Sequence, residues 1–190
     1  ILYNPTQYAL NPSEIPQIWL GGMSFHGGLA GVAIAMLWFA RRNNIRFLPL
    51  VDVVASVAPV GILFGRLANF VNGELWGRTT HAAWAMVFPS GGPLSRHPSQ
   101  LYEAALEGLV LLIIVQWLYR TEAVRRQSGM VAGIFLAGYA AARSLGELFR
   151  EPDAHIGFLI AGSTLGQWLS LPLVMLGIVL IVRARGSSPA

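Results

Sequence analysis

The chain has 190 residues, of which 54% are hydrophobic and 12% charged, and its mean hydropathy is +0.55. These values are typical of a polytopic membrane protein and exclude an ordinary soluble domain. The net charge is +4, but all 13 basic residues are arginines that lie mostly at the ends of apolar runs, so we expect no nucleic-acid partner. Without cysteine, these residues offer no disulfide, no thiolate metal site and no cysteine nucleophile.

Five apolar runs predict membrane-spanning helices. In chain order they cover residues 25–40, 47–64, 101–118, about 130–149 and 165–182. The first run is shorter than the roughly 20 residues that a crossing needs. If the helix begins at Leu20, it is long enough to cross the membrane, and His26 lies inside the membrane. Residues 1–19 are polar and interrupted by proline, which predicts an aqueous or interfacial segment without a cleavable signal peptide. Residues 79–98, rich in glycine and proline, predict a polar insert outside the membrane.

The arginines predict the orientation of the spans. Two loops and the tail carry most of them: Arg41, Arg42, Arg46, Arg120, Arg125, Arg126, Arg183 and Arg185. These segments share one side if the chain crosses five times, and the positive-inside rule makes that side cytoplasmic. The opposite half, where we place the functional site, holds Arg66, Arg78, Arg96, Arg143 and Arg150. The predicted fold class is all-α: a helical membrane bundle of about five spans that forms a single domain over residues 1–190.

Residues 65–78 concentrate polar groups directly after an apolar run and read G-R-L-A-N-F-V-N-G-E-L-W-G-R. Arg66, Asn69 and Gly73 share one face of a helix. A guanidinium at bilayer depth costs about 3 kcal/mol, so Arg66 should face the protein interior or a wet cavity and bind an anionic group. Asn69 either contacts ligand oxygens or bridges helices. We expect Gly73 and Gly77 at a tight bend or a close helix contact.

Arg66 and Arg143 lie in separate predicted spans. The functional interpretation is a clamp on a phosphodiester, because guanidinium forks match phosphate oxygens and keep their charge in a low dielectric. The alternative is a set of structural ion pairs with Glu74, Glu103 or Glu147. We favour the clamp, since charges inside a membrane are mostly functional. Glu147 follows Arg143 by four residues and is expected to orient it.

Other polar residues accompany the two arginines. Tyr139, one turn before the second of them, either donates a hydrogen bond to a ligand oxygen or packs at the interface. Arg150 is expected as an interfacial anchor or gate. A stripe at i, i+3 and i+7 predicts an interior polar seam that supports the arginines, and it consists of Gln100, Glu103 and Glu107.

His26 is the candidate general base, because histidine titrates near neutral pH. Gly27 and Gly28 follow it and leave room for a ligand, although a hydrogen-bonded core histidine is the alternative. His97, before Pro98, either positions the insert or assists catalysis. The histidines and carboxylates do not cluster at the spacing of metal ligands, so we expect no metal.

Four segments match, in order, the motifs of one known family. Residues 65–77 fit the pattern G-R-x-x-N-F-x-N-x-E-x-x-G. Residues 21–28 (G-G-M-S-F-H-G-G), 96–103 (R-H-P-S-Q-L-Y-E) and 138–153 (G-Y-A-A-A-R-S-L-G-E-L-F-R-E-P-D) are similar to its histidine motif, a span entry and its late arginine-bearing helix. On these motifs the chain resembles the prolipoprotein diacylglyceryl transferase family. Family members begin with an amino-terminal arm and further spans, so we expect this chain to lack them.

The resemblance implies a multi-pass enzyme of the bacterial inner membrane, in contact with membrane lipids, whose active site faces the periplasm. The implied reaction moves the diacylglyceryl group of phosphatidylglycerol to the lipobox cysteine thiol of a prolipoprotein signal peptide, the first step of lipoprotein maturation. No cofactor is implied. The implied substrate-binding residues are Arg66, Asn69, Glu74, Gly77, His97, Gln100, Glu103, Glu147 and Arg150.

The implied catalytic residues are His26, Arg66, Tyr139 and Arg143. As a hypothesis, His26 takes the thiol proton, Arg66 and Arg143 hold the phosphate, and Tyr139 orients the headgroup together with the substrate-binding Asn69. The alternative is that the positive field of the arginines activates the thiol without a histidine base.

Two other functions compete with this interpretation. A transporter or channel for anions or anionic lipids also buries arginines, but it predicts inverted repeats or broken half-helices, and neither is evident in the sequence. An intramembrane hydrolase needs a nucleophile beside a base. Ser24 and His26 lack the helical i, i+4 spacing, and no G-x-S-x-G motif occurs.

Overall fold

The computed structural model describes residue 10 and residues 25–152 and 157–186. The chain divides into two compact units, residues 1–50 and residues 51–190. The single domain expected over the whole chain therefore stays a prediction.

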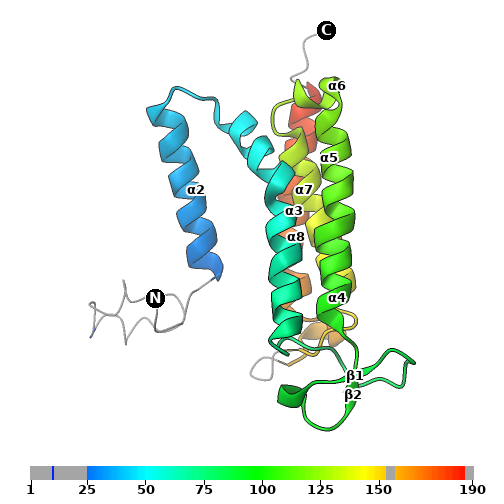
Figure 1. Ribbon diagram of the computed structural model, residues 1–190. Coiled ribbons are helices and arrows are strands. Elements are labelled where there is room, and N and C mark those ends of the chain that lie inside the picture. The colour runs from blue at the N-terminus through cyan, green and yellow to red at the C-terminus, as the bar shows by residue number, and fades with distance from the viewer. Residues whose placement is uncertain (1–9, 11–24, 153–156, 187–190) are drawn as a thin grey trace. The chain divides into compact units, whose positions relative to one another are not determined.

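The first unit contains α2 (Phe25–Arg42), an 18-residue helix shown in blue in Figure 1. It agrees with the first predicted run and ends in two arginines. The Cζ atom of Arg42 lies 5.6 Å from the centre of the Trp38 ring. Asn44 then turns the chain with a φ of 53°, a conformation that asparagine tolerates better than most residues. The predicted extension of this span to Leu20 lies outside the described residues.

The second unit is a bundle of long helices that lie side by side in Figure 1. α3 (Phe47–Val71) begins just before the boundary and carries Pro59. The following span is continuous and consists of α4 (Ser99–Glu103), the π-helix η4 (Ala104–Val110) and α5 (Leu111–Arg120). The remaining helices are α6 (Glu122–Arg125), α7 (Met130–Gly146), the 3₁₀ turn η5 (Ile160–Gly162) and α8 (Leu165–Gly186).

Three helices within the described residues are long and apolar enough to cross a membrane: Phe47–Val71, Ser99–Arg120 and Leu165–Gly186. A shorter apolar helix, Met130–Gly146, packs among them. This architecture confirms the predicted helical membrane bundle, while the number of five crossings stays a prediction.

α7 ends at Gly146, so the predicted end at residue 149 is wrong. The reason is a competing set of backbone bonds directly after the helix. Phe149 O accepts a hydrogen bond from Arg78 N at 2.8 Å, and Arg150 forms an antiparallel bridge with Gly77. These bonds draw the chain out of the helix before Pro152 stops it.

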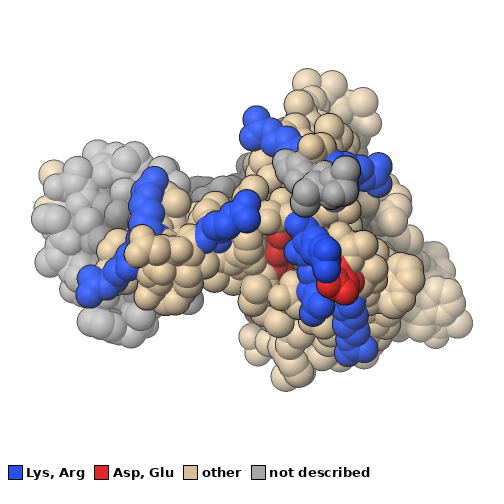
Figure 2. Space-filling model, turned by 90° about the horizontal axis from the view of Figure 1, so that it is seen from above, with Lys and Arg blue, Asp and Glu red and all other residues tan. Residues whose placement is uncertain are grey.

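The insert at residues 79–98 contains a small sheet that the sequence did not predict. β1 (Met86–Val87) pairs antiparallel with β2 (Ser95–Arg96), and the 3₁₀ turn η3 (Pro89–Gly91) lies between them. In Figure 1 this sheet lies at one end of the bundle, and α6 and the end of α8 lie at the other. Arginine side chains gather at that other end in Figure 2: Arg120, Arg125, Arg126, Arg183 and Arg185. Within the second unit, these arginines lie at the end of the bundle opposite the small sheet, while the predicted placement of Arg41, Arg42 and Arg46 on the same side stays a prediction.

α7 and α8 cross closely at two glycines. A Cβ atom added to Gly177 would lie 2.7 Å from the carbonyl oxygen of Gly133, and one added to Gly133 would lie 2.8 Å from that of Gly177. Two facing glycines let the backbones approach, which is how many membrane helices associate. This crossing fixes α8 against α7, the helix that carries Arg143.

A buried carboxylate joins α3 to the start of α7. Oδ2 of Asp52 accepts a hydrogen bond from Gly129 N at 2.6 Å, and Oδ1 accepts one from Ala132 N at 2.8 Å. The first amides of a helix lack partners within the helix, so Asp52 caps α7 from another element. A second bond, from Gln116 Nε2 to Ser56 O at 2.9 Å, joins α5 to α3 one turn before Pro59.

Candidate functional site

Two glutamates on the span Ser99–Arg120 hold the predicted arginines together. Oε1 of Glu103 lies 2.6 Å from Arg143 Nη1, and Oε2 of Glu103 lies 3.0 Å from Arg66 Nη1. Oε2 of Glu107 accepts two hydrogen bonds from Arg66, at 3.0 Å from Nε and 2.8 Å from Nη2. The structure therefore brings Arg66 of α3 and Arg143 of α7 to the same two carboxylates.

Two further charged groups extend this cluster beyond the end of α7. Glu147 forms an ion pair with Arg143, four residues earlier in the chain, as the spacing predicted. Nη1 of Arg150 lies 3.7 Å from Glu103 Oε1. Three arginines and three glutamates thus form one network, which we call the charge cluster: Arg66, Glu103, Glu107, Arg143, Glu147 and Arg150.

The charge cluster is shielded from solvent. The side chains of Glu103 and Glu107 are 0% exposed, and those of Arg66 and Arg143 are each 14% exposed. Removing one partner from such a buried pair costs about 3–5 kcal/mol, because the other charge is left without compensation. The predicted interior polar seam is confirmed, and the ion pairs that were the alternative to the clamp are also present. Whether the arginines also contact a ligand depends on the space beside them.

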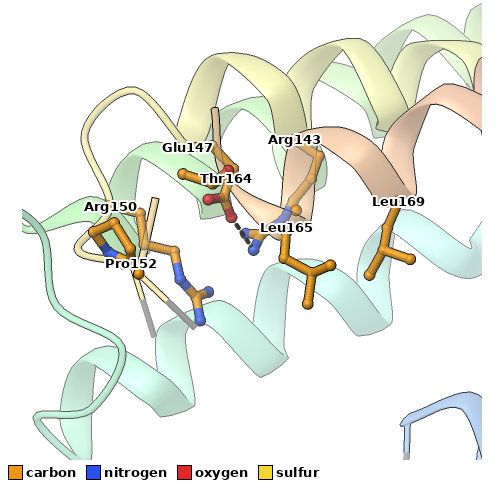
Figure 3. Close-up of a pocket in the computed structure, with 9 residues that line it drawn as sticks. Arg143, Glu147, Arg150, Pro152, Thr164, Leu165 and Leu169 are labelled. Carbon is orange, nitrogen blue, oxygen red and sulfur yellow. Dashed lines mark ion pairs between the residues drawn. The ribbon is translucent and has the colours of Figure 1, made fainter. Parts of the chain in front are cut away.

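A cavity of about 120 Å³ lies beside part of the charge cluster. A cavity needs a volume of only about 10–15 Å³ to hold one water molecule, so this cavity has room for a polar group of several atoms. Figure 3 shows Arg143 and Arg150 extending from α7 and the turn after it, and Leu165 and Leu169 from α8. The full lining is Arg143, Glu147, Arg150, Pro152, Gly157, Thr164, Leu165, Gly166 and Leu169. Arg66 is not part of it, so the two predicted clamp residues do not line this cavity together.

The start of α8 forms one wall of this cavity. Thr164 N donates to Gln167 Oε1 at 3.1 Å, and Gln167 N donates to Thr164 Oγ1 at 3.4 Å, which is a capping box. The positive end of the helix dipole therefore lies at the cavity wall, next to two guanidinium groups. Glu147 lines the same cavity, and its carboxylate packs against Gly166 in the first turn of α8, so it offsets part of this positive charge. The second guanidinium and the helix N-terminus favour an anionic ligand.

Residues 65–78, which we call the signature stretch, end in a segment that lies between two other segments. Gly73 turns the chain after α3 with a φ of 66°, as its predicted place at a tight bend requires. Gly77 N donates to His97 O at 2.9 Å, and a Cβ on Gly77 would lie 2.6 Å from both His97 O and Phe149 O. Only glycine fits there, so Gly77 permits a close backbone approach rather than a close helix contact.

Some predicted contacts of the signature stretch are wrong. Glu74 was a candidate ion-pair partner of Arg66 and Arg143, but its carboxylate accepts a hydrogen bond from Asn72 Nδ2 at 3.2 Å and is exposed. The buried Glu103 and Glu107 take its place at Arg66 because they project from the facing span. Glu74 contributes its backbone oxygen, which accepts from the buried Gln100 at 2.6 Å.

His97 belongs to a cluster of rings at the insert. Its Nδ1 lies 3.1 Å from the hydroxyl of Tyr102, which also accepts a hydrogen bond from Trp84 Nε1 at 2.6 Å. The ring centre of His97 lies 5.4 Å from that of Phe149, edge to face. His97 thus ties the insert to the turn after α7, and its role toward a substrate stays a prediction.

The remaining predicted site residues lie around the cluster or outside the described side chains. Tyr139 stacks on Phe135 with ring centres 6.2 Å apart and packs against the core of the bundle. Asn69 is half-buried on α3, the helix of Arg66. The backbone of His26 lies in α2, and its side chain lies outside the described part.

Several residues that line the cavity were not predicted. Thr164, Gly166 and Leu169 carry no charge, so nothing marked them as neighbours of the arginines. The capping-box pattern of Thr164 and Gln167 at the start of an apolar run is the signal that would have placed a helix N-terminus here.

The described histidines and carboxylates form no group that could hold a metal ion.

Comparisons with known proteins give the chain its relatives. Residues 1–183 match the model of the family described as prolipoprotein diacylglyceryl transferase. Proteins named phosphatidylglycerol–prolipoprotein diacylglyceryl transferase are similar to it in Rhodospirillum rubrum (55% identical over 190 residues, 100% of this chain and 69% of the relative) and Rhizobium meliloti (58% over 183 residues, 95% and 65%). A third, from Paramagnetospirillum magneticum, is 51% identical over 193 residues, 100% of this chain and 72% of the relative.

The chain thus spans about two thirds of the length of these curated relatives. The family model covers nearly all of this chain, including the signature stretch and the segment that bears Arg143 and Arg150. The chain belongs to the prolipoprotein diacylglyceryl transferase family.

Proposed function

We propose that the protein transfers the diacylglyceryl group of phosphatidylglycerol to the lipobox cysteine thiol of a prolipoprotein. Family membership and the names of the relatives support this activity. The observation that carries it here is the cavity beside Arg143 and Arg150, which two guanidinium groups and a helix N-terminus make favourable for a phosphate.

Arg143 has enough N–H donors to bind a ligand in addition to its glutamate partners. A guanidinium carries five N–H groups on three nitrogens. Within the described residues, Arg143 uses Nη1 toward Glu103 and Glu107 and Nη2 toward Glu147. The glutamates therefore hold the guanidinium in place and leave donors for a phosphate oxygen. A charge that is oriented before the substrate binds stabilises the departing phosphate without further reorganisation.

The apolar lining of the cavity suits the lipid part of the donor. Leu165 and Leu169 of α8 line the cavity together with the guanidinium groups. A phosphatidylglycerol molecule has a charged headgroup and two apolar acyl chains, so charged and apolar side chains of one cavity match both parts of it. The proposed site is in the outer leaflet of the inner membrane, at the end of the bundle opposite the arginine-rich loops.

The proposed chemistry is a displacement at the glyceryl carbon that bears the phosphate. The cysteine sulfur forms a bond to this carbon, the carbon–oxygen bond breaks, and glycerol phosphate leaves with the electron pair. The thiol must lose its proton to become a strong nucleophile. We assign that proton to His26, and the binding of the leaving phosphate to Arg143 and Arg150, with Arg66 supporting them through Glu103. This modifies the clamp of Arg66 and Arg143 that the sequence suggested.

The test is transfer of labelled diacylglyceryl from phosphatidylglycerol to a lipobox peptide, in membranes that contain the protein. We expect transfer by the unaltered protein and none by Arg143→Ala, because the departing phosphate loses its main cation. Arg126→Gln is the matched control, since Arg126 is exposed and pairs with Glu122 on α6. Normal turnover by Arg143→Ala contradicts the assignment of this residue.

A second arm tests the acceptor. A lipobox peptide with serine in place of cysteine should receive no lipid, because a serine hydroxyl is far less acidic than a thiol. Transfer to the serine peptide contradicts the thiolate step. Absence of transfer to the cysteine peptide by the unaltered protein contradicts the proposed function itself.

A further inference from the structure

Arg78, the last residue of the signature stretch, contacts the end of α7 although it does not line the cavity. Its Nε donates to the backbone oxygen of Arg150 at 3.0 Å, and its Nη2 donates to that of Glu147 at 3.1 Å. The last carbonyl groups of a helix lack partners within the helix and carry the negative end of the helix dipole. One guanidinium from another segment therefore caps α7 where two cavity-lining residues emerge.

The same guanidinium also contacts the residue that follows Gly157. Cζ of Arg78 lies 5.0 Å from the centre of the Phe158 ring, within the range of a cation–π contact. Phe158 directly follows Gly157, whose φ of 67° marks a turn and which lines the cavity. Arg78 thus touches a residue whose direct neighbour, Gly157, lines the cavity.

The backbone of Arg78 is fixed as firmly as its side chain. Arg78 N donates to Phe149 O at 2.8 Å, and Arg78 O accepts from His97 N at 3.0 Å. The neighbouring Gly77 has no room for a Cβ between His97 and Phe149. Phe149 lies between Glu147 and Arg150, so the backbone and the side chain of Arg78 are attached to the same turn after α7. From this fixed point the guanidinium reaches Phe158 and acts as a brace between the two segments.

We propose that Arg78 is a positioning residue that holds two lining segments of the cavity together, the backbone of Glu147 and Arg150 and the segment from Gly157 to Phe158. That the ligand is a phospholipid headgroup rests on the function proposed above. The consequence is specific: Arg78 sets how well the cavity fits the lipid donor, and it does not touch the thiol or the departing phosphate. Its loss should raise the KM for the lipid and leave the KM for the peptide unchanged.

Lysine cannot replace this brace. A guanidinium donates to two carbonyls from a planar fork and lays its face on a ring, whereas an ammonium is a single strongly hydrated point charge. Arg78→Lys keeps the charge and loses the geometry. It therefore separates bracing from a general electrostatic attraction for anionic lipid, which lysine would preserve.

Arg96, in the insert that follows Arg78, is a matched control. It donates to two backbone oxygens, those of Gly91 at 3.1 Å and Gly77 at 3.2 Å, and its Cζ lies 4.0 Å from the centre of the Trp76 ring. It also pairs with Glu151. Arg96→Gln removes the same kinds of contact as Arg78→Gln, but none of the four partner residues of Arg96 lines the cavity.

The experiment measures kcat and the two KM values for the unaltered protein and for Arg78→Gln, Arg78→Lys, Phe158→Leu and Arg96→Gln. For both Arg78 variants we expect the KM for phosphatidylglycerol to rise on the order of tenfold, with kcat and the peptide KM within about twofold. Phe158→Leu should raise the lipid KM by a smaller factor, and Arg96→Gln should not change it. An equal rise in Arg96→Gln, or a normal lipid KM in Arg78→Lys, overturns the proposal.

A second readout does not depend on activity. Hydrogen exchange of the amides at residues 147–150 should accelerate on the order of tenfold in Arg78→Gln, because the end of α7 loses its cap, and it should stay unchanged in Arg96→Gln. Unchanged exchange in Arg78→Gln overturns the brace. If the unaltered protein transfers no lipid while exchange responds as expected, the proposed function fails and the brace stands.

Discussion

Nη1 of Arg143 lies 2.6 Å from Oε1 of Glu103, and this contact ties α7 to α4 in the interior of the bundle. The other oxygen of the same carboxylate lies 3.0 Å from Arg66. Glu103 is therefore shared among Arg66, Arg143 and, at 3.7 Å, Arg150. A carboxylate placed in this way fixes the orientation of the guanidinium groups before a ligand binds.

The first prediction concerns this shared carboxylate. Glu103→Gln keeps the size of the side chain but removes its charge and points an NH₂ group toward a guanidinium. Breaking a buried ion pair costs about 3–5 kcal/mol, so we expect the variant to unfold at a clearly lower temperature in detergent and to lose transfer activity. Thermal unfolding followed by circular dichroism measures the first effect.

The matched control for that variant is Glu122→Gln. Glu122 pairs with Arg126 at the surface, where an i, i+4 pair contributes only about 0.3–0.5 kcal/mol. Its unfolding temperature should stay close to that of the unaltered protein. Equal unfolding temperatures for Glu103→Gln and Glu122→Gln would show that the charge cluster does not stabilise the bundle.

The interior of the site was predictable because charged and polar side chains on apolar helices avoid the lipid and face the protein interior. Gln100, Glu103 and Glu107 share a stripe on an otherwise apolar span, so they had to face the protein and meet whatever cations lay there. Arg66 and Arg143 were the cations in neighbouring spans. Burial and pairing then followed from the cost of leaving such groups in hydrocarbon.

The cavity was not predictable, since its position depends on backbone contacts between distant segments. The end of α7 at Gly146 is set by bonds from residues 76–78, and no local pattern announces them. From the sequence, Arg78 could not be distinguished from other arginines near a membrane surface. Its hydrogen-bond partners are backbone oxygens, which the sequence does not identify. The wall formed by Leu165 and Leu169 required the α7–α8 crossing to be known.

The second prediction uses two glycines of the signature stretch. A Cβ on Gly77 would lie 2.6 Å from two carbonyl oxygens, whereas one on Gly65 would meet no atom within 4 Å. We expect Gly77→Ala to displace the segment that carries Arg78 and to abolish transfer, and Gly65→Ala to retain it. The measurement is the transfer assay at equal protein levels in the membrane. Full activity of Gly77→Ala would contradict the tight passage of this segment between its two neighbours.

The third prediction concerns the cap that α3 provides for α7. Asp52 accepts from two amides with two different oxygens, so Asp52→Ala leaves both amides without this acceptor and should cost about 2 kcal/mol. Asp52→Asn retains one acceptor oxygen and should fall between Asp52→Ala and the unaltered protein. Hydrogen exchange of the amides at residues 129–132 reports the effect locally. Exchange in Asp52→Ala as slow as in the unaltered protein would rule out a capping role.

The fourth prediction tests the α7–α8 crossing, where two effects of one methyl group oppose each other. Replacing a helical glycine by alanine gains up to about 1 kcal/mol of helix propensity. At Gly177 the added Cβ would lie 2.7 Å from a backbone oxygen and 2.8 Å from a backbone nitrogen, neither of which can rotate away. Overpacking of this kind costs about 1–3 kcal/mol, so the clash outweighs the propensity and Gly177→Ala should destabilise the bundle.

Gly61→Ala is the control for that substitution, because Gly61 lies on α3 with no atom within 4 Å of an added Cβ. Only the propensity acts there, so this variant should be as stable as the unaltered protein or slightly more stable. Unfolding temperatures measured in the same detergent compare the two. The opposite order, with Gly177→Ala the more stable variant, would mean that α7 and α8 have room to separate. The leucine wall of α8 would then not be held at a fixed distance from Arg143.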